Sequence, residues 1–208
     1  MKFSVGYQAD ERLKQIALAN RERIAEVYFP WWGFTTGRGI PAGGLDAQRK
    51  LEADLDDYSA AGIMLHLLLN GNCYGRDAQS RRFFQSIGDT VELLRERYAL
   101  GGVTTASPLI AKFLKANFPH LEIRASVNME IGTVEGIEYV EDSFDGFYLK
   151  REYNYDRPRT EAIHRYCRER GKKLYLLANS GCLNFCSART FHDNLVAHQH
   201  EIAGMDNS

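Results

Sequence analysis

The most reactive side chains of this chain lie in one segment near its C-terminal end. An apolar run over residues 174–178 ends at Asn179, and the residues that follow supply two thiols, a guanidinium and two imidazoles. Thiolates and imidazoles bind soft and borderline metals, and they also act as nucleophiles and bases. The segment therefore predicts either a metal site or thiol-based catalysis, and its candidate residues are Cys182, Cys186, Arg189, His192 and His198.

A helix that begins near Ser187 would place Arg189 and His192 on one face, because residues three apart are neighbours on a helix. Both side chains would then lie near the positive N-terminal end and beside the thiols. A guanidinium and a helix N-terminus together favour a thiolate or a bound anion, such as a carboxylate substrate. A solvated, charged helix face is the simpler alternative for the same pattern, and a surface histidine is the default for His198.

A third thiol belongs to the same predicted rim. Cys73 follows an apolar strand over 63–69, and Cys182 follows the strand over 173–178. Parallel strands end at one edge of a barrel, so Cys73, Cys182 and Cys186 are expected to converge there, with His192 or an external group as a fourth ligand. Such a set suits zinc or an iron–sulfur cluster. The alternative is that the cysteines are buried as small apolar side chains without a function.

Composition limits the classes of protein to consider. The chain has 208 residues, of which 44% are hydrophobic, and 26 basic residues balance 27 acids for a net charge of -1. These values predict one domain over 1–208 and give no strong signal for nucleic acid. No apolar run is long enough for a membrane span, and no secretory signal follows Met1, so we expect a cytoplasmic protein whose cysteines are thiols or ligands.

Strand and helix patterns alternate along the chain, which is typical of a parallel α/β fold. The first strand is not followed by a glycine-rich phosphate turn, so a TIM-like (β/α) barrel fits better than a doubly wound sheet. Predicted helices cover 10–20, 46–60, 77–98 and 159–170, and another opens at Ser107-Pro108. Predicted strands cover 3–7, 24–29, 63–69, 103–106, 121–127, 146–150 and 173–178.

Seven strands fall one short of a closed barrel of this type, which has eight in about 250 residues. The eighth unit is therefore missing or supplied elsewhere, and 1–208 would then be an incomplete N-terminal domain. An open seam leaves two unpaired strand edges. We expect a truncated chain, a partner chain or following domain at the seam, or an unusual closure.

Two further features fall at or inside this predicted barrel. Trp31-Trp32 follow the second strand, where they would either form a stacking wall for a planar substrate or cap the mouth. His66 lies inside the apolar strand, and a hydrogen-bonded histidine in the barrel interior is the favoured interpretation.

Two familiar catalytic motifs are absent from the sequence: neither a G-x-S-x-G elbow nor an H-E-x-x-H pair occurs. Cys167, within the predicted helix over 159–170, is expected to be a half-buried helix thiol rather than a rim ligand.

The order of segments resembles the collagenase-like peptidase family, family thirty-two of the unassigned class. The likeness covers nearly the whole chain, from VGYQADERLKQIALANRERIAEVYFPW through VTTASPLIAKFLKANFPHLEIRASVNM to the late cysteine motif. That motif carries the most weight and reads N-x-G-C-x-x-x-C-x-x-R-x-x-H-x-N from Asn179 to Asn194.

The resemblance implies a barrel-like N-terminal domain and a function that differs between branches. Some members are named as proteases, and others look like iron–sulfur-dependent hydroxylation factors for RNA bases or quinone precursors. In the cluster-binding branches four cysteines hold a four-iron cluster, and Cys73, Cys182 and Cys186 match that role here. The fourth ligand would be His192, a residue after Ser208, or absent. The family continues with a further strand, in agreement with the strand count.

Three functions are compatible with these residues. The first is an enzyme or enzyme component whose thiol-rich mouth holds a metal or cluster for hydroxylation-type chemistry. The second is a peptidase in which Cys182 or a rim metal attacks a peptide bond, with Arg189 and His192 beside it. The third is a non-catalytic subunit that binds a partner through the open seam. The substrate is not specified by the sequence.

Overall fold

The computed structural model describes residues 2–37, 44–179 and 181–198. Its strands form one seven-stranded, entirely parallel sheet in which the spatial order follows the order in the sequence. This is the arrangement of a (β/α) barrel and confirms the predicted fold class. The strands are β1 (Phe3–Gly6), β2 (Ile24–Pro30), β3 (Met64–Leu69), β4 (Leu100–Thr105), β5 (Glu122–Ala125), β6 (Gly146–Tyr148) and β7 (Lys173–Tyr175).

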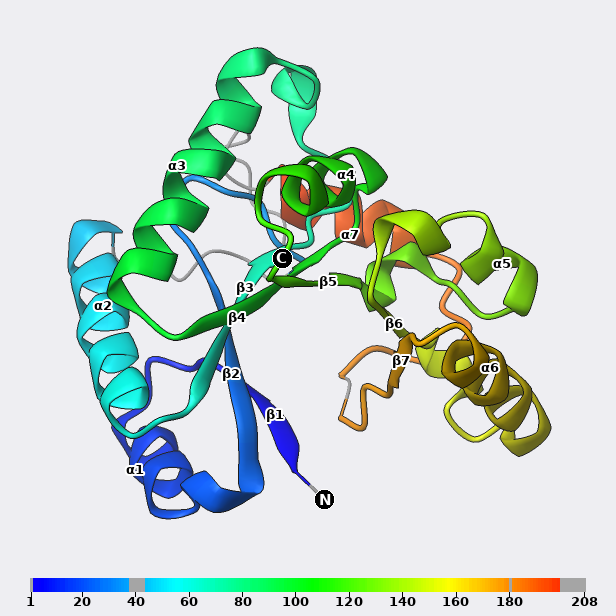
Figure 1. The fold of residues 1–208 in the computed structure, drawn as a ribbon, viewed down its shortest axis with the longest axis horizontal. Coiled ribbons are helices and arrows are strands. Elements are labelled where there is room, and N and C mark those ends of the chain that lie inside the picture. The colour runs from blue at the N-terminus through cyan, green and yellow to red at the C-terminus, as the bar shows by residue number, and fades with distance from the viewer. Residues whose placement is uncertain (1, 38–43, 180, 199–208) are drawn as a thin grey trace.

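Helices follow the strands and cover the outer face of the sheet (Figure 1). Their first turns are capped by short polar side chains: Asp10, Ser80, Ser107 and Asp156 each accept a hydrogen bond from a backbone N–H at a helix start. The helices are α1 (Glu11–Ala19), α2 (Gly44–Ala60), α3 (Arg81–Arg97), α4 (Pro108–Asn117), α5 (Val134–Glu138), α6 (Arg157–Glu169) and α7 (Arg189–Ala197).

Several predicted boundaries were wrong by a few residues. The fourth strand begins at Leu100 rather than at 103, because the Gly101-Gly102 pair continues the ladder with β3. The last strand ends at Tyr175 rather than at 178. Residues 75–77 form a separate turn of 3₁₀ helix before α3 starts at Arg81. Residues 38–43 and Ser180 lie outside the described residues.

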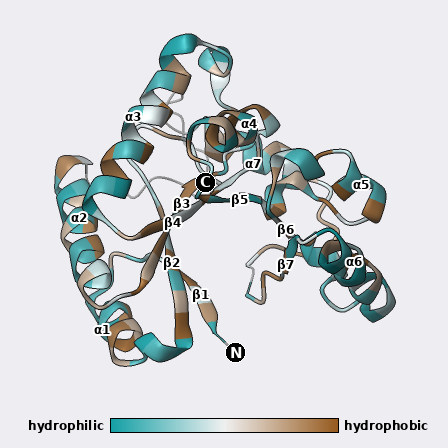
Figure 2. Cartoon of the chain, in the orientation of Figure 1, coloured by the Kyte–Doolittle hydropathy of each residue, from teal (hydrophilic) through white to brown (hydrophobic). Residues whose placement is uncertain are grey.

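The two faces of the sheet differ in chemistry. Outward side chains such as Val27, Leu67 and Ile123 are fully buried against the helices and form the apolar core. In Figure 2 both colours occur along the strands and along the helices, as expected where only one face of each element meets the apolar core. Alternate positions of the same strands point inward and are mostly polar or glycine, unlike the branched apolar layers that usually fill a barrel. Inward positions include Glu26, Tyr28, His66, Gly102, Thr104, Glu122, Arg124, Gly146, Tyr148 and Tyr175.

Glycines make room for these inward side chains. A Cβ atom on Gly102 would lie 2.8 Å from the His66 ring and 2.3 Å from the backbone oxygen of Glu122. A Cβ atom on Gly146 would lie 2.8 Å from the Tyr175 ring. Real Cβ atoms do not approach other heavy atoms so closely, so the polar interior depends on glycine at both positions.

The sheet is curled but is not closed within the described residues. β1 and β7 are its two edges, and no described strand pairs with either outer side (Figure 1). Phe3 on β1 and Leu176 just after β7 are about half exposed beside these edges. The structure thus agrees with the strand count from sequence. Among the described residues no helix is both long and apolar enough to cross a membrane.

Candidate functional site

A cavity of about 430 Å³ opens at the mouth of the half-barrel, where the strands end. A pocket of this size accommodates a small organic ligand or part of a peptide. Its lining comes from the ends of β2 to β7 and from α7, in agreement with the rule that barrel sites lie at the C-terminal ends of the strands. The lining includes Tyr28, Leu68, Asn70, Thr104, Ser126, Asn128, Tyr148, Arg151, Leu177, Asn179, Cys182 and His192.

Asparagine amides tie one side of this cavity together. The Asn70 side chain accepts a 3.0 Å hydrogen bond from the Gly37 amide, and the Asn128 side chain donates at 3.0 Å to the Asn70 carbonyl. Ser126 caps the following turn by accepting from the Asn128 amide at 3.1 Å. Gly37 is required here, because its Cβ atom would lie 2.2 Å from the Asn128 side-chain nitrogen. The loops after β2, β3 and β5 therefore form one connected rim.

Two of the predicted site residues, Cys182 and His192, lie together at this cavity, and the others do not. Cys182 and His192 both line it, alongside Asn179. Cys73 and Cys186 are half-buried and do not line it. None of these cysteines, all within the described residues, forms a disulfide. The mouth therefore presents one thiol and one imidazole to a ligand, rather than the predicted three thiols.

The predicted donor set does not assemble as a metal site. In the described ranges no group of three or more His, Cys, Asp or Glu side chains is arranged to hold a metal ion. Cys73, Cys182, Cys186 and His192 are all within those ranges, so the side chains as placed do not fit a cluster or a zinc ion. Cluster or zinc binding stays a prediction.

Arg189 has a role different from the predicted one. Its side chain is 4% exposed, and its Nη1 atom lies 2.6 Å from the buried Glu152 carboxylate and 3.2 Å from Glu130. Asp193, one turn along α7, lies at 3.9 Å from Nε and accepts a 3.5 Å hydrogen bond from Asn72. The guanidinium is thus directed at carboxylates from other loops and from α7 itself. It fastens α7 to the loops after β5 and β6.

Below the cavity, the barrel interior holds a buried ion-pair network. The Arg124 guanidinium donates to both oxygens of Glu26 and, at 3.0 and 3.2 Å, to both oxygens of Glu122. Tyr175 donates to Glu122 at 2.5 Å and lies under the guanidinium, and Ser4 donates to Glu26 at 2.8 Å. The donors on Arg124 are therefore used by carboxylates of the protein.

These contacts keep both acids ionised. Burial alone would raise the pKa of Glu122, but hydrogen bonds from Arg124 and Tyr175 outweigh it and lower that pKa to about 2. Burial and Arg124 oppose each other in the same way at Glu26, and the pKa of Glu26 is lowered overall. Arg124 stays charged, because its two carboxylate partners raise its pKa despite its own burial.

His66 links this network to the cavity. It is 1% exposed, its Nε2 atom lies 2.8 Å from the Thr104 hydroxyl, and its Nδ1 atom lies 3.8 Å from Glu26. Burial, reinforced by the nearby charge of Arg124, lowers the pKa of His66 to about 3, so the ring is neutral at physiological pH. The predicted hydrogen-bonded interior histidine is confirmed.

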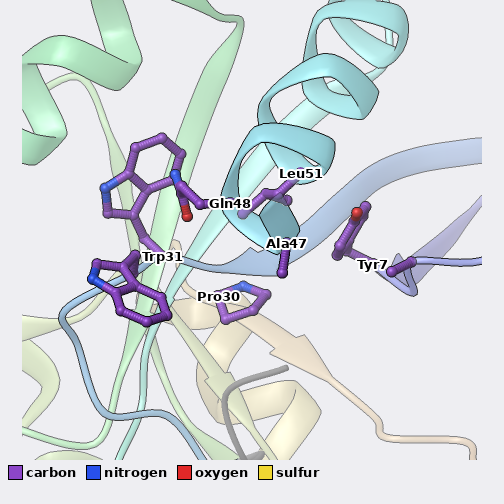
Figure 3. Close-up of a pocket in the computed structure, with 8 residues that line it drawn as sticks. Tyr7, Pro30, Trp31, Ala47, Gln48 and Leu51 are labelled. Atoms are coloured by element: carbon purple, nitrogen blue, oxygen red, sulfur yellow. The ribbon is translucent and has the colours of Figure 1, made fainter. Parts of the chain in front are cut away.

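The tryptophan pair lies at a second, smaller pocket. Figure 3 shows Tyr7, Pro30 and Trp31 from the first two strand ends beside Ala47, Gln48 and Leu51 of α2. This pocket measures about 30 Å³, which is room for water or a methyl group and not for a planar substrate. Neither Trp31 nor Trp32 lines the mouth cavity, so the stacking-wall interpretation has no support from the geometry.

The other candidate residues lie away from the site. Cys167 is fully buried on α6 rather than half-buried as predicted, and burial raises the pKa of its thiol. His198 follows the end of α7 and does not line the cavity.

Sequence reasoning missed the polar side chains of the barrel interior, which are the acids Glu26 and Glu122 together with Arg124 and Thr104. The available signal was a polar side chain at every second position of an otherwise apolar strand, as in Glu26-Val27-Tyr28 and Glu122-Ile123-Arg124.

Comparisons with known proteins identify the fold. No protein-family model matches the chain, and no curated protein matches it in sequence. The solved structure of the U32 peptidase Mk0906 superposes with a TM-score of 0.78 at 19% identity, covering 99% of this chain and 80% of that one. An L-Ala-D/L-Glu epimerase is similar over 94% of this chain and 54% of its own, with a TM-score of 0.51 at 12% identity. The first match supports the family resemblance seen in the sequence, and at these identities both matches show a shared fold.

Proposed function

We propose that this chain is a barrel domain of a peptidase-type enzyme of the collagenase-like family, and that the mouth cavity binds the substrate. The observation that carries the proposal is that Cys182 and His192 line one cavity together with side-chain amides. A thiol, an imidazole and hydrogen-bond donors around one cavity are the groups required for acyl transfer from a peptide bond.

In the proposed reaction each residue has one role. The Cys182 sulfur attacks the scissile carbonyl carbon as its proton passes to His192, which later delivers a proton to the leaving amine. The side-chain amide of Asn179 supplies a donor to the developing oxyanion. Water then hydrolyses the thioester, which releases the acid and restores the thiol.

Two further observations support this assignment. The sequence motif from Asn179 to Asn194 contains Cys182 and His192, and it carried the family resemblance. The structure that superposes over 99% of this chain is described as a U32 peptidase. At 19% identity the match itself establishes a shared fold.

Digestion of a defined peptide library, read by mass spectrometry, tests the proposal. The wild-type chain should produce new peptide termini, and Cys182→Ala should lower the cleavage rate at least ~10³-fold, on the order of the loss of a nucleophile. Cys73→Ala is the matched control, because that thiol lies outside the cavity, and it should retain the wild-type rate. Cleavage that survives in Cys182→Ala would contradict the proposal and indicate a contaminating protease.

The predicted metal or cluster is a separate proposal with a separate test. Metal analysis and a visible spectrum of anaerobically purified protein would detect iron or zinc, and Cys182→Ser should remove it. A colourless, metal-free protein that gains nothing on reconstitution would contradict it. Its support is limited to two donors, Cys182 and His192, at one cavity.

A partner at the open seam is likewise proposed from the sheet edges. The outer sides of β1 and β7 offer backbone hydrogen-bonding groups, and Phe3 and Leu176 add apolar surface beside them. A strand from another chain or a following domain would pair with these edges. Light scattering tests the partner-chain form, because a stable monomer at high concentration would contradict it.

A further inference from the structure

Thr104 is a buried polar residue that lines the mouth cavity. It is 4% exposed on β4, yet its side chain contributes to the cavity lining. Tyr28 and Tyr148 line the same region from β2 and β6. The Thr104 hydroxyl lies 2.8 Å from Nε2 of the buried His66, and this contact determines which way the hydroxyl proton points.

The surroundings of His66 favour one tautomer of its ring. Nδ1 lies 3.8 Å from the Glu26 carboxylate, which is kept ionised by Arg124. A lone pair on Nδ1 would be repelled by that anion, whereas an N–H there is attracted to it. With the proton on Nδ1, Nε2 is an acceptor, and the Thr104 hydroxyl must donate to it.

A hydroxyl whose proton is already used presents only lone pairs to the cavity. The neighbouring Arg124 guanidinium is directed at the carboxylates of Glu26 and Glu122. Burial raises the pKa of Tyr148 to about 12, so that phenol keeps its proton and remains a donor. Thr104 is thus an acceptor held in a fixed orientation in the cavity lining.

We propose that Thr104, oriented by His66, is a specificity-determining residue that accepts a hydrogen bond from an N–H group at the buried end of the ligand. An amine or amide N–H fits this acceptor, and a carboxylate or other acceptor-only group does not. The inference rests on the proposed function only for the identification of the cavity as the substrate site. Its test measures binding and not hydrolysis, so the two can fail independently.

The tautomer of His66 can be read directly by ¹⁵N NMR on histidine-labelled protein, with His66→Gln used to assign its signals. The expected spectrum has a proton on Nδ1 and none on Nε2. A proton on Nε2 would overturn the inference, because Thr104 would then accept from the ring and have its own proton free for a ligand.

Two small probes then test recognition in the same spectra. Glycinamide, which offers N–H donors, should shift the His66 Nε2 signal saturably, and acetate, which offers only acceptors, should not. Thr104→Ser keeps the hydroxyl and should keep the glycinamide response. Thr104→Val removes the hydroxyl at nearly constant volume and should abolish the response. An equal response to acetate, or an unchanged response in Thr104→Val, would overturn the inference.

Discussion

Arg124 on β5 pairs with Glu26 on β2 through both terminal guanidinium nitrogens, although β3 and β4 separate the two strands in the sheet. The contact crosses the interior and is made possible by the curl of the sheet. It lies in the same interior as His66, which connects the ion pair to Thr104 in the lining of the mouth cavity. The half-barrel is therefore held in shape by polar groups that adjoin the candidate site.

Arg124→Met should destabilise the fold strongly. Removing one partner of a buried pair leaves the other charge without compensation, at a cost of about 3–5 kcal/mol. Urea unfolding of the two proteins measures the loss. Arg97→Met is the control, since Arg97 pairs with Glu52 and Asp56 on the surface and should lose at most about 1 kcal/mol. Equal losses for the two variants would contradict an essential cross-barrel pair.

His66 should make stability depend on pH in the acid range. Its pKa is about 3 in the folded chain and about 6.5 in the unfolded chain, so between these values only the unfolded state takes up a proton. The free energy of unfolding therefore falls as the pH drops from 6.5 toward 3. His66→Gln should flatten this slope in urea titrations at several pH values, and His164→Gln, on the exposed side of α6, should leave it unchanged. A slope unaffected by His66→Gln would argue against a neutral interior ring.

The fold could be predicted from the sequence further than the site could. Alternating helix patterns and apolar strands are local features, and they identified seven parallel strands. The sequence motif had already grouped Cys182 and His192 as candidates for one site. Glu26, Thr104 and Arg124 were missed because their significance depends on contacts between strands distant in the sequence. The contacts of Arg189 could not be predicted from the sequence, because its partners Glu130 and Glu152 come from other loops.

Gly102→Ala should disturb the interior from the backbone side. The added methyl group would meet the backbone oxygen of Glu122 and the His66 ring at distances that neither strand can accept. Overpacking of this kind costs about 1–3 kcal/mol, which thermal unfolding would detect. Gly181→Ala is the control, because a Cβ atom on Gly181 would meet no other atom within 4 Å and its φ is not positive. An unchanged thermal stability in Gly102→Ala would indicate a wider spacing between β3, β4 and β5.

Arg189→Gln should release α7 from the mouth. The change leaves Glu152 buried without its 2.6 Å partner, so hydrogen exchange should accelerate across 189–197 while β2 to β5 stay protected. A second substitution, Glu152→Gln, removes the remaining charge and should restore part of the protection. Unchanged exchange in Arg189→Gln would show that the ion pair does not fasten the helix.

The central claim, that Cys182 is the reactive thiol of a substrate cavity, is tested most directly by labelling with a peptidyl chloromethyl ketone and mapping the modified cysteine by mass spectrometry. We predict selective modification of Cys182 that a competing peptide slows and that His192→Gln weakens. Cys167 should stay unmodified because it is buried in the core. Labelling spread equally over Cys73, Cys182 and Cys186, or unaffected by the competing peptide, would contradict the claim.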